Sequence, residues 1–475
     1  MAGPEYDVIV VGGGPAGSTA ASVIALDGHR VLLLERETFP RYQIGESLLP
    51  STIHGVLPVL GVLDEVMASG FVVKKGGTFR WGSSQEPWTF SFAASPRMVE
   101  LGAYGFQVER NRFDAILLKN AARLGVEVRQ GCRAVDVLRD GERVGGVRFA
   151  DENDDLHEAT ARFVVDASGH GSRLHNAVGG RREYSEFFRH LAVFSYFVGG
   201  ARVPAPNSGN ILCAAFDRGW FWYIPLSDDL TSVGAVVSVD EAPTIQSDPE
   251  AALHQLIREC PLIESYLSGA RRATEEPYDR VRVRKDFSYD RTALWCPGMV
   301  LVGDAACFID PVFSSGVHLS TYGAMQAARS INSSLAGIVD ESRAFGEFEK
   351  RYRREFAMFR DFLVAFYKMN VAEETYYWKA KQIAQHDGAV LEAFVELVGG
   401  MSGGDIAPPR ELPPEARTMP IPPNVIGAFA ANMEMGMRDM HGEVTPLGTS
   451  AEGDALTVSP DGRRWVLHAA QPVPR

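Results

Sequence analysis

Short runs of hydrophobic residues open the chain. Residues 7–11 and 30–35 are nearly continuous apolar runs, separated by a glycine-rich turn and a helical segment. Such runs are typical of a parallel sheet covered on both faces. Residues 111–124 then have the apolar spacing of a helix, and the alternation in 126–166 predicts a small antiparallel meander. The beginning of the chain therefore predicts an α/β fold.

A second sheet is expected from the middle of the chain. Alternating polar and apolar positions predict strands at 191–198, 219–225 and 232–239, followed by a helix at 249–268. Strand–turn–helix spacing returns at 293–337. We interpret the intervening strands as a sheet-based domain inserted in the first one.

An aromatic stripe marks a long helix after residue 340. Its members recur every three or four residues and predict one face packed on the core: Phe345, Phe348, Tyr352, Phe356, Phe359, Phe362 and Phe366. Residues 401–424 are rich in Gly and Pro and predict an irregular linker. Residues 455–468 predict a closing hairpin.

Charge and cysteine content exclude several classes of function. The 475 residues carry a formal net charge of −13, which argues against nucleic acid or an anionic membrane as the main partner. No apolar run reaches the ~18 residues of a membrane span. The five cysteines are scattered without a CxxC pair, so we expect neither a disulfide framework nor a metal site, and a cytoplasmic location.

A dinucleotide fingerprint follows the first strand. Gly12-x-Gly14-x-x-Gly17 opens a helix whose free amides and dipole favour a pyrophosphate. Glu35 ends the next strand, where its carboxylate can accept both hydroxyls of an adenosine ribose. The fingerprint by itself does not separate FAD from NAD.

Three further segments resemble the FAD enzymes built like aromatic hydroxylases. They are the buried strand that ends in Gly303-Asp304, the stretch 107–110 followed by Phe113-Asp114, and the turn 165–169. The resemblance covers roughly the first 340 residues and implies that Asp304 binds ribityl or pyrophosphate-side groups and that Arg110 lies by the flavin. The predicted cofactor-binding residues are Gly12, Gly14, Pro15, Ala16, Gly17, Glu35, Arg36, Arg41, Ser47, Arg110, Asp304, Pro311 and Gly316.

The flavin signals complete the predicted architecture. We expect a Rossmann-like FAD-binding domain of the aromatic-hydroxylase and glutathione-reductase type, made of residues 1–185 and 286–340. Residues 186–285 form the inserted sheet domain for substrate. Residues 341–475 form a mostly helical C-terminal region with the terminal hairpin.

Three spaced motifs resemble the flavin-dependent halogenases. Residues 220–225 (WFWYIP) match the WxWxIP motif of that family, and residues 308–316 match its FxxPxxSxG pattern. Lys74 stands in the K-x-G setting of the family's catalytic lysine, and residues 45–50 resemble its loop beside the flavin. Alone, 220–225 would fit a strand with core aromatics; the joint occurrence favours the halogenase.

The resemblance implies a reaction. Reduced FAD and O2 give a C4a-hydroperoxide, chloride attacks it, and the resulting hypochlorous acid is directed by a lysine. The amides of Ser315 and Gly316 at a helix start suit a halide, and burial readily lowers the pKa of a lysine such as Lys74. The expected barrier between flavin and substrate consists of Trp220, Trp222, Pro225 and Phe313.

One departure narrows the expected substrate. Halogenases of free tryptophan carry a glutamate where this chain has Phe313. The chain is more similar to halogenases of phenolic or pyrrolic rings, free or attached to a carrier protein, in antibiotic or polyketide biosynthesis. The run Tyr376-Tyr377-Trp378 also resembles that group. No substrate base is identified from the sequence, and His318 is expected to pack at the start of the helix after Gly316.

Other functions stay open at this point. The main alternative is an FAD hydroxylase that uses NAD(P)H directly, whereas a halogenase requires a separate flavin reductase as partner. A flavin reductase of isoprenoid double bonds and a catalytically silent flavoprotein share the fold. Neither of these needs Lys74.

Overall fold

The computed structural model describes five stretches of the chain, which are residues 3–81, 86–285, 288–371, 395–401 and 456–467. The predicted linker beyond Met401 and the run Tyr376-Tyr377-Trp378 lie outside the described residues. No helix among the described stretches is both long enough and apolar enough to cross a bilayer.

A parallel sheet forms the core of the first unit. Its strands follow the order β19-β20-β10-β1-β2-β7, parallel except for the edge strand β19. Both predicted apolar runs lie in it, and their apolar residues are buried, as expected for a sheet covered on both faces. The bounds are β1 (Tyr6–Val11), β2 (Val31–Leu34), β7 (Glu127–Arg129), β10 (Leu156–Asp166), β19 (Trp295–Cys296) and β20 (Met299–Leu301).

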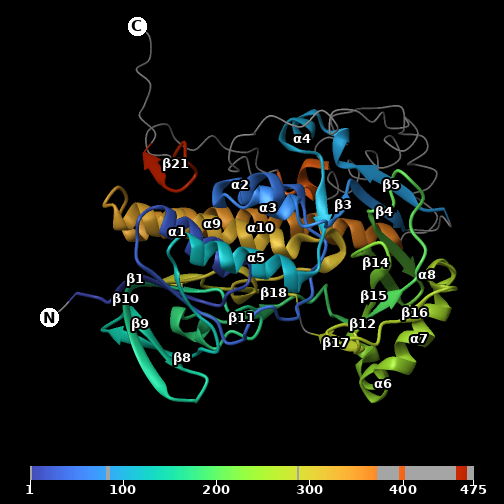
Figure 1. The fold of residues 1–475 in the computed structure, drawn as a ribbon, viewed down its shortest axis with the longest axis horizontal. Helices are drawn as coiled ribbons and strands as arrows, with labels where there is room; N and C mark the ends of the chain where they lie inside the picture. Colours follow the sequence, from blue (N-terminus) through green and yellow to red (C-terminus); the bar gives the residue numbers. More distant parts are fainter. Residues whose placement is uncertain (1–2, 82–85, 286–287, 372–394, 402–455, 468–475) are drawn as a thin grey trace, which may run out of the picture.

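Helices and a meander cover this sheet. Helix α1 (Pro15–Leu26) packs against α5 (Arg110–Arg123) and α9 (Ser315–Leu335), and all three lie above the strands in Figure 1. Strands β8 (Arg133–Asp140) and β9 (Arg143–Ala150) lie below. Strand β9 pairs antiparallel with both β8 and β10, so the predicted meander is confirmed.

The second sheet joins strands from two parts of the chain. Its order is β16-β12-β15-β14-β13-β4-β5, with β17 beside β12. Strands β4 and β5 precede the segment predicted for the inserted domain, and β13 pairs with β4 in parallel. The bounds are β4 (Gly76–Arg80), β5 (Trp88–Ser91), β12 (His190–Val198), β13 (Ile211–Phe216), β14 (Gly219–Pro225), β15 (Leu230–Ser238), β16 (Arg271–Arg272) and β17 (Arg282–Lys285).

Three short helices cover the outer face of the second sheet. They are α6 (Ala242–Ser247), α7 (Pro249–Glu259) and α8 (Pro261–Leu267), which share an apolar cluster with that face. The prediction of one helix over 249–268 was wrong. Pro261 cannot donate a backbone hydrogen bond, so α7 ends at Glu259 and α8 begins at the proline.

Short elements link the two sheets. Two small antiparallel pairs are β3 (Val72–Lys74) with β6 (Gly105–Gln107), and β11 (Arg182–Tyr184) with β18 (Tyr289–Arg291). A π-helix, Ser51–Val56, follows the loop at 45–50. The short helices are α2 (Leu57–Leu60), α3 (Leu63–Met67) and α4 (Pro96–Leu101).

Helix α10 (Glu341–Val371) runs from the first sheet to the second. Near its start, Trp295 Nε1 donates to Glu349 Oε2 at 2.9 Å, and near its end Trp81 Nε1 donates to the Phe366 carbonyl at 3.2 Å. The predicted aromatic stripe is confirmed, because all seven of its side chains are buried. The helix therefore holds both units on one rigid element.

The end of the chain is anchored on the first unit. Strands β21 (Leu456–Val458) and β22 (Trp465–Leu467) pair as the predicted hairpin. The Trp465 indole is fully buried and donates to Ser330 Oγ at 2.9 Å, and its backbone amide donates to Ser333 Oγ at 2.7 Å. Arg351 stacks on the indole at 4.6 Å from the ring centroid.

We expect Trp465→Ala to destabilise the protein by about 3–5 kcal/mol, because it removes a large buried aromatic side chain. The shift of the urea midpoint measures this loss. Leu467→Ala is the control on the same strand, since Leu467 is 52% exposed and its loss should cost within about 0.5 kcal/mol. Equal shifts for the two variants would show that the hairpin does not anchor the fold.

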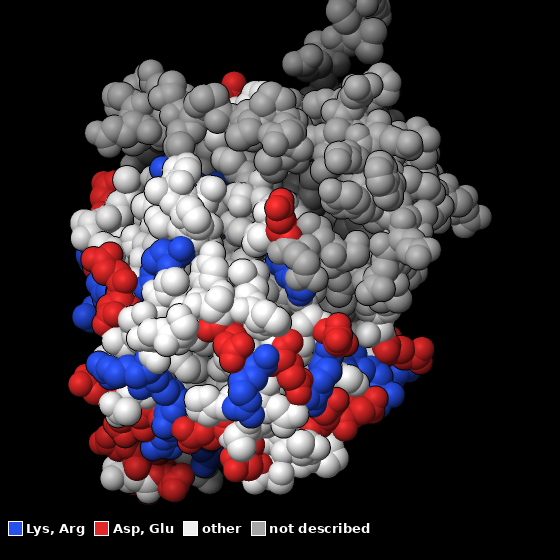
Figure 2. Space-filling model, turned by 90° about the vertical axis from the view of Figure 1, so that its right-hand side faces the viewer, with Lys and Arg blue, Asp and Glu red and all other residues white. Residues whose placement is uncertain are grey.

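Acidic and basic side chains are mixed on the surface over the second unit. Figure 2 shows blue and red atoms interspersed there, with no broad area of one sign. This face offers no stripe of positive charge for a nucleic acid backbone.

Candidate active site

The first glycine turn is shaped for close approach of a ligand. Gly12 has φ +103°, which favours glycine, and a Cβ on Gly17 would lie 1.8 Å from the Gly12 carbonyl oxygen. Gly14 caps α1 without any side-chain bond, and Pro15 occupies the first turn. The helix N-terminus thus keeps free amides for an anion.

Glu35 holds this turn from the next strand. Its Oε2 accepts from the Gly13 amide at 2.6 Å, and its Oε1 accepts from the Glu37 amide at 2.8 Å. The predicted position of Glu35 beside the glycine turn is therefore observed. Arg36 instead lies exposed and pairs with Glu37 at 3.3 Å.

Two arginines share one buried aspartate behind the turn. Arg41 Nη1 lies 2.9 Å from Asp114 Oδ2, and Arg110 Nε lies 2.7 Å from Asp114 Oδ1. Arg110 also donates to the Ile44 carbonyl at 2.7 Å, and a Cβ on Gly14 would lie 3.3 Å from Arg41 Nη2. The pairing fixes both guanidinium groups beside the turn and the loop at 45–50.

Unsatisfied buried polar atoms gather on that loop. Glu46 Oε2, Ser47 Oγ and Gln107 Oε1 have no hydrogen-bond partner among the described residues. Burial raises the pKa of Glu46 to about 7, although the Tyr196 hydroxyl, which donates to Oε1 at 2.6 Å, opposes the shift. Buried polar atoms without partners are costly and point to a missing polar ligand.

The second glycine turn meets the first. In the short helix Gly303–Ala305, a Cβ on Gly303 would lie 3.1 Å from Ala16 Cβ. Loss of solvent around its carboxylate raises the pKa of Asp304 to about 6, while Arg110 opposes this shift. The glycine cradle, the Glu35 carboxylate and the unsatisfied polar atoms fit a dinucleotide such as FAD.

A strained turn precedes α9. Pro311 begins the short helix Pro311–Phe313, and Ser314 follows in the left-handed region with φ 61°. Such strain in a non-glycine residue collects at functional sites. Helix α9 then starts at Ser315 without any side-chain cap, so the amides of Ser315 and Gly316 lack a partner within the helix.

Lys74 reaches this turn from the end of β3. Its side chain is 2% exposed, and its Nζ donates to Ser314 Oγ at 3.3 Å. Its Nζ also lies 5.7 Å from the centroid of the Phe92 ring. Burial lowers the pKa of Lys74 to about 7, and the nearby Cys213 thiol opposes the shift only in part. The fold thus places a buried lysine with a lowered pKa beside the N-terminus of α9.

The motif at 220–225 divides between two faces of the second sheet. Alternation along β14 puts Trp220 and Trp222 on the inner face, which belongs to the main core, and Pro225 on the opposite side. The Trp222 ring crosses Gly234 of the next strand, where a Cβ would lie 2.3 Å from Cζ2. Trp222 Nε1 donates to Ser232 Oγ at 3.1 Å.

An aromatic cluster extends from Phe313, next to the Lys74 partner Ser314, to Trp220. We define it as Phe79, Trp81, Trp220, Phe313 and Phe366, each at most 8% exposed. Phe313 lies 4.7 Å from Phe366 and 5.6 Å from Phe79, and Trp81 lies 4.6 Å from Phe366 between ring centroids. The Phe313 side chain, next to Ser314, thus packs against apolar rings.

Two polar groups near the site were not predicted. In the first group, the Tyr367 hydroxyl is hydrogen-bonded to both Trp220 and Asp310. Asp310 lies within the 308–316 motif, and Tyr367 follows the last residue of the aromatic stripe. In the other, His318 Nδ1 lies 2.8 Å from Ser51 Oγ, and its Nε2 lies 2.8 Å from Glu355 Oε1. All three members of this second group are buried, and they tie the start of α9 to α10.

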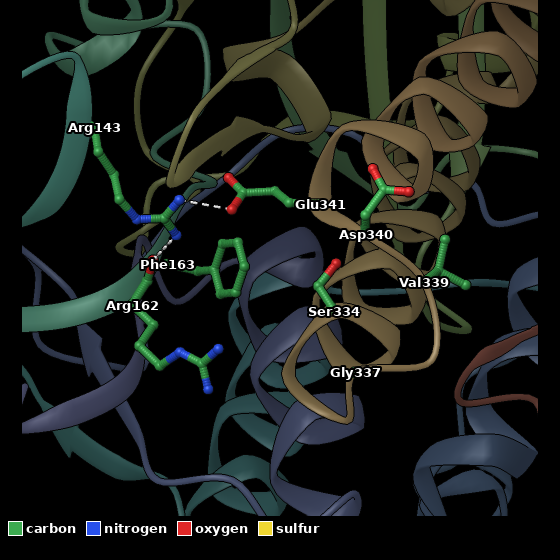
Figure 3. A pocket seen from close by; sticks show the side chains of 8 residues that line it. All are labelled: Arg143, Arg162, Phe163, Ser334, Gly337, Val339, Asp340 and Glu341. Atoms are coloured by element: carbon green, nitrogen blue, oxygen red, sulfur yellow. Dashed lines mark hydrogen bonds and ion pairs between the residues drawn. The ribbon is translucent and has the colours of Figure 1, made fainter.

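A pocket of about 500 Å³ lies elsewhere, between the meander and the loop from α9 to α10 (Figure 3). Arg143 is its central cation, and Glu341 Oε2 at 2.6 Å and the Arg162 carbonyl at 2.7 Å already bind it. The pocket shares no residue with the predicted site.

The chain matches one protein family. Residues 7–103 and 94–411 match the family described as tryptophan halogenase. A tryptophan 2-halogenase from Chondromyces crocatus is 36% identical over 410 residues, which cover 83% of this chain and 75% of the relative. A chlorinase of 1H-pyrrole-2-carbonyl-[peptidyl-carrier protein] from Pseudomonas fluorescens is 29% identical over 395 residues, which cover 78% of this chain and 85% of the relative.

Solved structures agree with the sequence relatives. The myxobacterial chondrochloren halogenase, described as a new variant of FAD-dependent halogenases, is 49% identical with a TM-score of 0.78. The match covers 97% of this chain and 99% of that chain. The predicted fold class, with its Rossmann-like FAD-binding unit, is confirmed.

Proposed function

This chain belongs to the tryptophan halogenase family, and from that premise we propose that it chlorinates a phenol-like or pyrrole-like ring with Lys74 as the catalytic residue. It is a flavin-dependent halogenase, and the relatives favour halogenation over the alternative of direct hydroxylation. Its cofactors are FAD in the reduced form, O2 and a halide.

The contact between Lys74 and Ser314 carries the proposal. Bound reduced FAD, with O2, supplies the oxidation of halide to hypohalous acid. Lys74 Nζ, at 3.3 Å from Ser314 Oγ, then directs the electrophile by a hydrogen bond or holds it as a chloramine. With its pKa lowered to about 7 by burial, the amine has both protonation states within reach near neutral pH.

We assign halide binding to the amides of Ser315 and Gly316. These amides begin α9, where the helix dipole favours an anion and no side chain caps the end. A site made of backbone donors holds chloride without a fixed cation that would pair with it permanently. The proximity of Lys74 to Ser314 supports this assignment, since halide and lysine then serve one reaction.

The inner-face tryptophans have a separate role in the proposal. We assign Trp220 and Trp222 to the barrier that keeps the substrate from direct contact with flavin. Both indoles are buried and held by hydrogen bonds, so they are rigid walls. Phe313 adds an apolar surface next to Ser314.

Phe313 supports the substrate class. Phe313 stands where halogenases of free tryptophan carry a glutamate, and its apolar ring cannot replace a carboxylate that orients and activates the substrate. A phenol does not need a carboxylate at this position, because its own hydroxyl activates the ring. The pyrrole chlorinase from Pseudomonas fluorescens acts on a substrate bound to a peptidyl carrier. We therefore include both free and carrier-attached rings from natural-product biosynthesis in the proposal.

A separate flavin reductase is the expected partner. Flavin-dependent halogenases require reduced flavin, and we propose that a second protein supplies it to this chain. All five cysteines are free, which fits a reducing cytoplasm as the place of action.

The proposed function is tested by mass spectrometry. Purified enzyme with FAD, a flavin reductase, NADH, chloride and a panel of free and carrier-loaded phenols and pyrroles should give products with the isotope pattern of one chlorine. Reactions without reductase are the control and should give none. Hydroxylated product with direct consumption of NADPH by the enzyme alone would contradict the proposal.

A further inference from the structure

A chain of hydrogen bonds joins the two recognised motifs. Trp220 Nε1 donates to the Tyr367 hydroxyl at 2.6 Å, and this hydroxyl donates to Asp310 Oδ2 at 2.9 Å. His190 Nδ1 lies 3.4 Å from the same carboxylate oxygen. The His190 ring also stacks on Tyr367, with 5.3 Å between ring centroids. Tyr367 from α10 and His190 from β12 thus meet at the Asp310 carboxylate before α9, and Trp220 from β14 joins them through the Tyr367 hydroxyl.

The carboxylate of Asp310 is buried without a permanent positive charge. Its side chain is 0% exposed, and among the described residues its ion-pair partner is His190. The other oxygen, Oδ1, accepts from the Val312 amide at 3.1 Å. Burying a carboxylate is expensive, and here neutral donors and one imidazole offset that cost. Each oxygen accepts a hydrogen bond, so the carboxylate is held with Oδ2 against the exchangeable proton of Tyr367.

The two ends of the hydrogen-bonded chain lie in different surroundings. The His190 side chain is 19% exposed and connects Asp310 to solvent. Tyr367 lies at the other end, 5.6 Å from Trp81 of the aromatic cluster between ring centroids, and is partly exposed. The Tyr367 end therefore lies beside the aromatic cluster, where the proposal places the substrate ring, and the His190 end reaches solvent.

We propose that Tyr367, Asp310 and His190 form a proton relay that accepts the hydroxyl proton of a phenol-like substrate. The inference rests on the proposed function for its substrate class. The phenol O–H bond breaks and its proton goes to the Tyr367 oxygen, while the Tyr367 proton passes to Asp310 Oδ2. The electron pair stays on the substrate oxygen, nothing is oxidised or reduced, and His190 returns the proton from Asp310 to solvent.

The relay supplies what the halogenation step needs. A phenolate is a far stronger carbon nucleophile than a phenol, so removal of the proton prepares the ring for the electrophile held at Lys74. General-base catalysis of this kind contributes about 10²- to 10⁴-fold. The groups that face Asp310 are Tyr367 from α10, His190 from β12 and the Cys213 thiol from β13.

Asp310→Asn and Tyr367→Phe test the relay with two kinds of substrate. The first is a phenol that is neutral at the assay pH, and the second is a polyfluorinated phenol that is already ionised. We expect each variant to lose about 100-fold in kcat relative to the wild type with the neutral phenol. With the ionised phenol we expect a loss below about threefold, since no proton has to be removed.

Further variants separate the relay from a structural role. Trp220→Phe removes the donor to Tyr367 but no relay member, so it should slow both phenols by the same factor. Oxidation of reduced flavin should be unchanged in Asp310→Asn and Tyr367→Phe. Equal losses with both phenols in these two variants would overturn the relay. Wild-type enzyme that chlorinates pyrroles but no phenol would overturn the relay and leave the proposed function standing, whereas chlorination of neither ring type would overturn the proposed function.

Discussion

Lys74→Met should lose chlorination by about 10²- to 10⁴-fold while the oxidation of reduced flavin continues at the wild-type rate. Methionine has nearly the length of lysine, so it fills the same space at the end of β3 without the amine. The flavin site is built from other residues, including the glycine turn and Glu35. Hypochlorous acid would still form but would lack the group that directs it.

The same substitution should stabilise the protein. Burial lowers the pKa of Lys74 to about 7 from its ordinary 10.5, so the unfolded chain binds more protons than the folded chain between these values. Stability therefore rises with pH across that window, and the cost of the buried charge is greatest below pH 7. The gain in Lys74→Met should be largest at pH 6 and should shrink as the pH increases.

Product formation and protein stability are both measured, and a variant of the neighbouring residue serves as the control. Chlorinated product is quantified by mass spectrometry, and the urea midpoint is compared with wild type at several pH values. Lys75→Met is the matched control, because Lys75 is the next residue and is exposed. It should leave product formation and the midpoint almost unchanged. Chlorination retained in Lys74→Met would refute the role of this lysine.

Gly17→Ala should abolish FAD binding. The added Cβ would lie 1.8 Å from the Gly12 carbonyl oxygen, which is backbone and has to shift together with the start of α1. We expect FAD to bind at least about 100-fold more weakly, which corresponds to ~3 kcal/mol. The visible flavin absorbance of the purified protein and a titration with FAD measure the loss.

Gly346→Ala is the matched glycine control. Gly346 is exposed on α10, and a Cβ there would have no atom within 4 Å. Alanine within a helix is better than glycine by about 1 kcal/mol, so the variant should be slightly more stable and bind FAD normally. Normal FAD content in Gly17→Ala would show that the turn tolerates a side chain and that its glycine is not required.

The sequence contains much of the fold because the decisive signals are local. Continuous apolar runs at 7–11 and 30–35 predict a parallel sheet, and the aromatic period after Phe345 predicts α10. The recruitment of β4 to the second sheet could not be predicted, since pairing with β13 connects residues more than 130 positions apart. The break at Pro261 was readable from the proline and was missed.

The candidate site likewise has a part that the sequence predicts and a part that depends on the fold. Lys74 and residues 314–316 stand in motifs, so each was predictable on its own. Their contact depends on how the fold brings the end of β3 to the turn before α9. Tyr367 belongs to no motif and follows the last residue of the predicted aromatic stripe. Its partnership with Asp310 and Trp220 arises because three distant segments converge, and no spacing in the sequence reports such a meeting.

Helix α10 also fixes both the distance and the rotation between the side chains at its two ends. Its 31 residues span about 46 Å, and each residue turns the helix by about 100°. One residue inserted between Glu349 and Phe362 would therefore rotate Phe366 and Tyr367 away from the second sheet while the start of the helix kept its place. Seven residues would restore the face but displace it by about 10 Å. The length of α10 between its two anchors is therefore fixed by its contacts with both sheets.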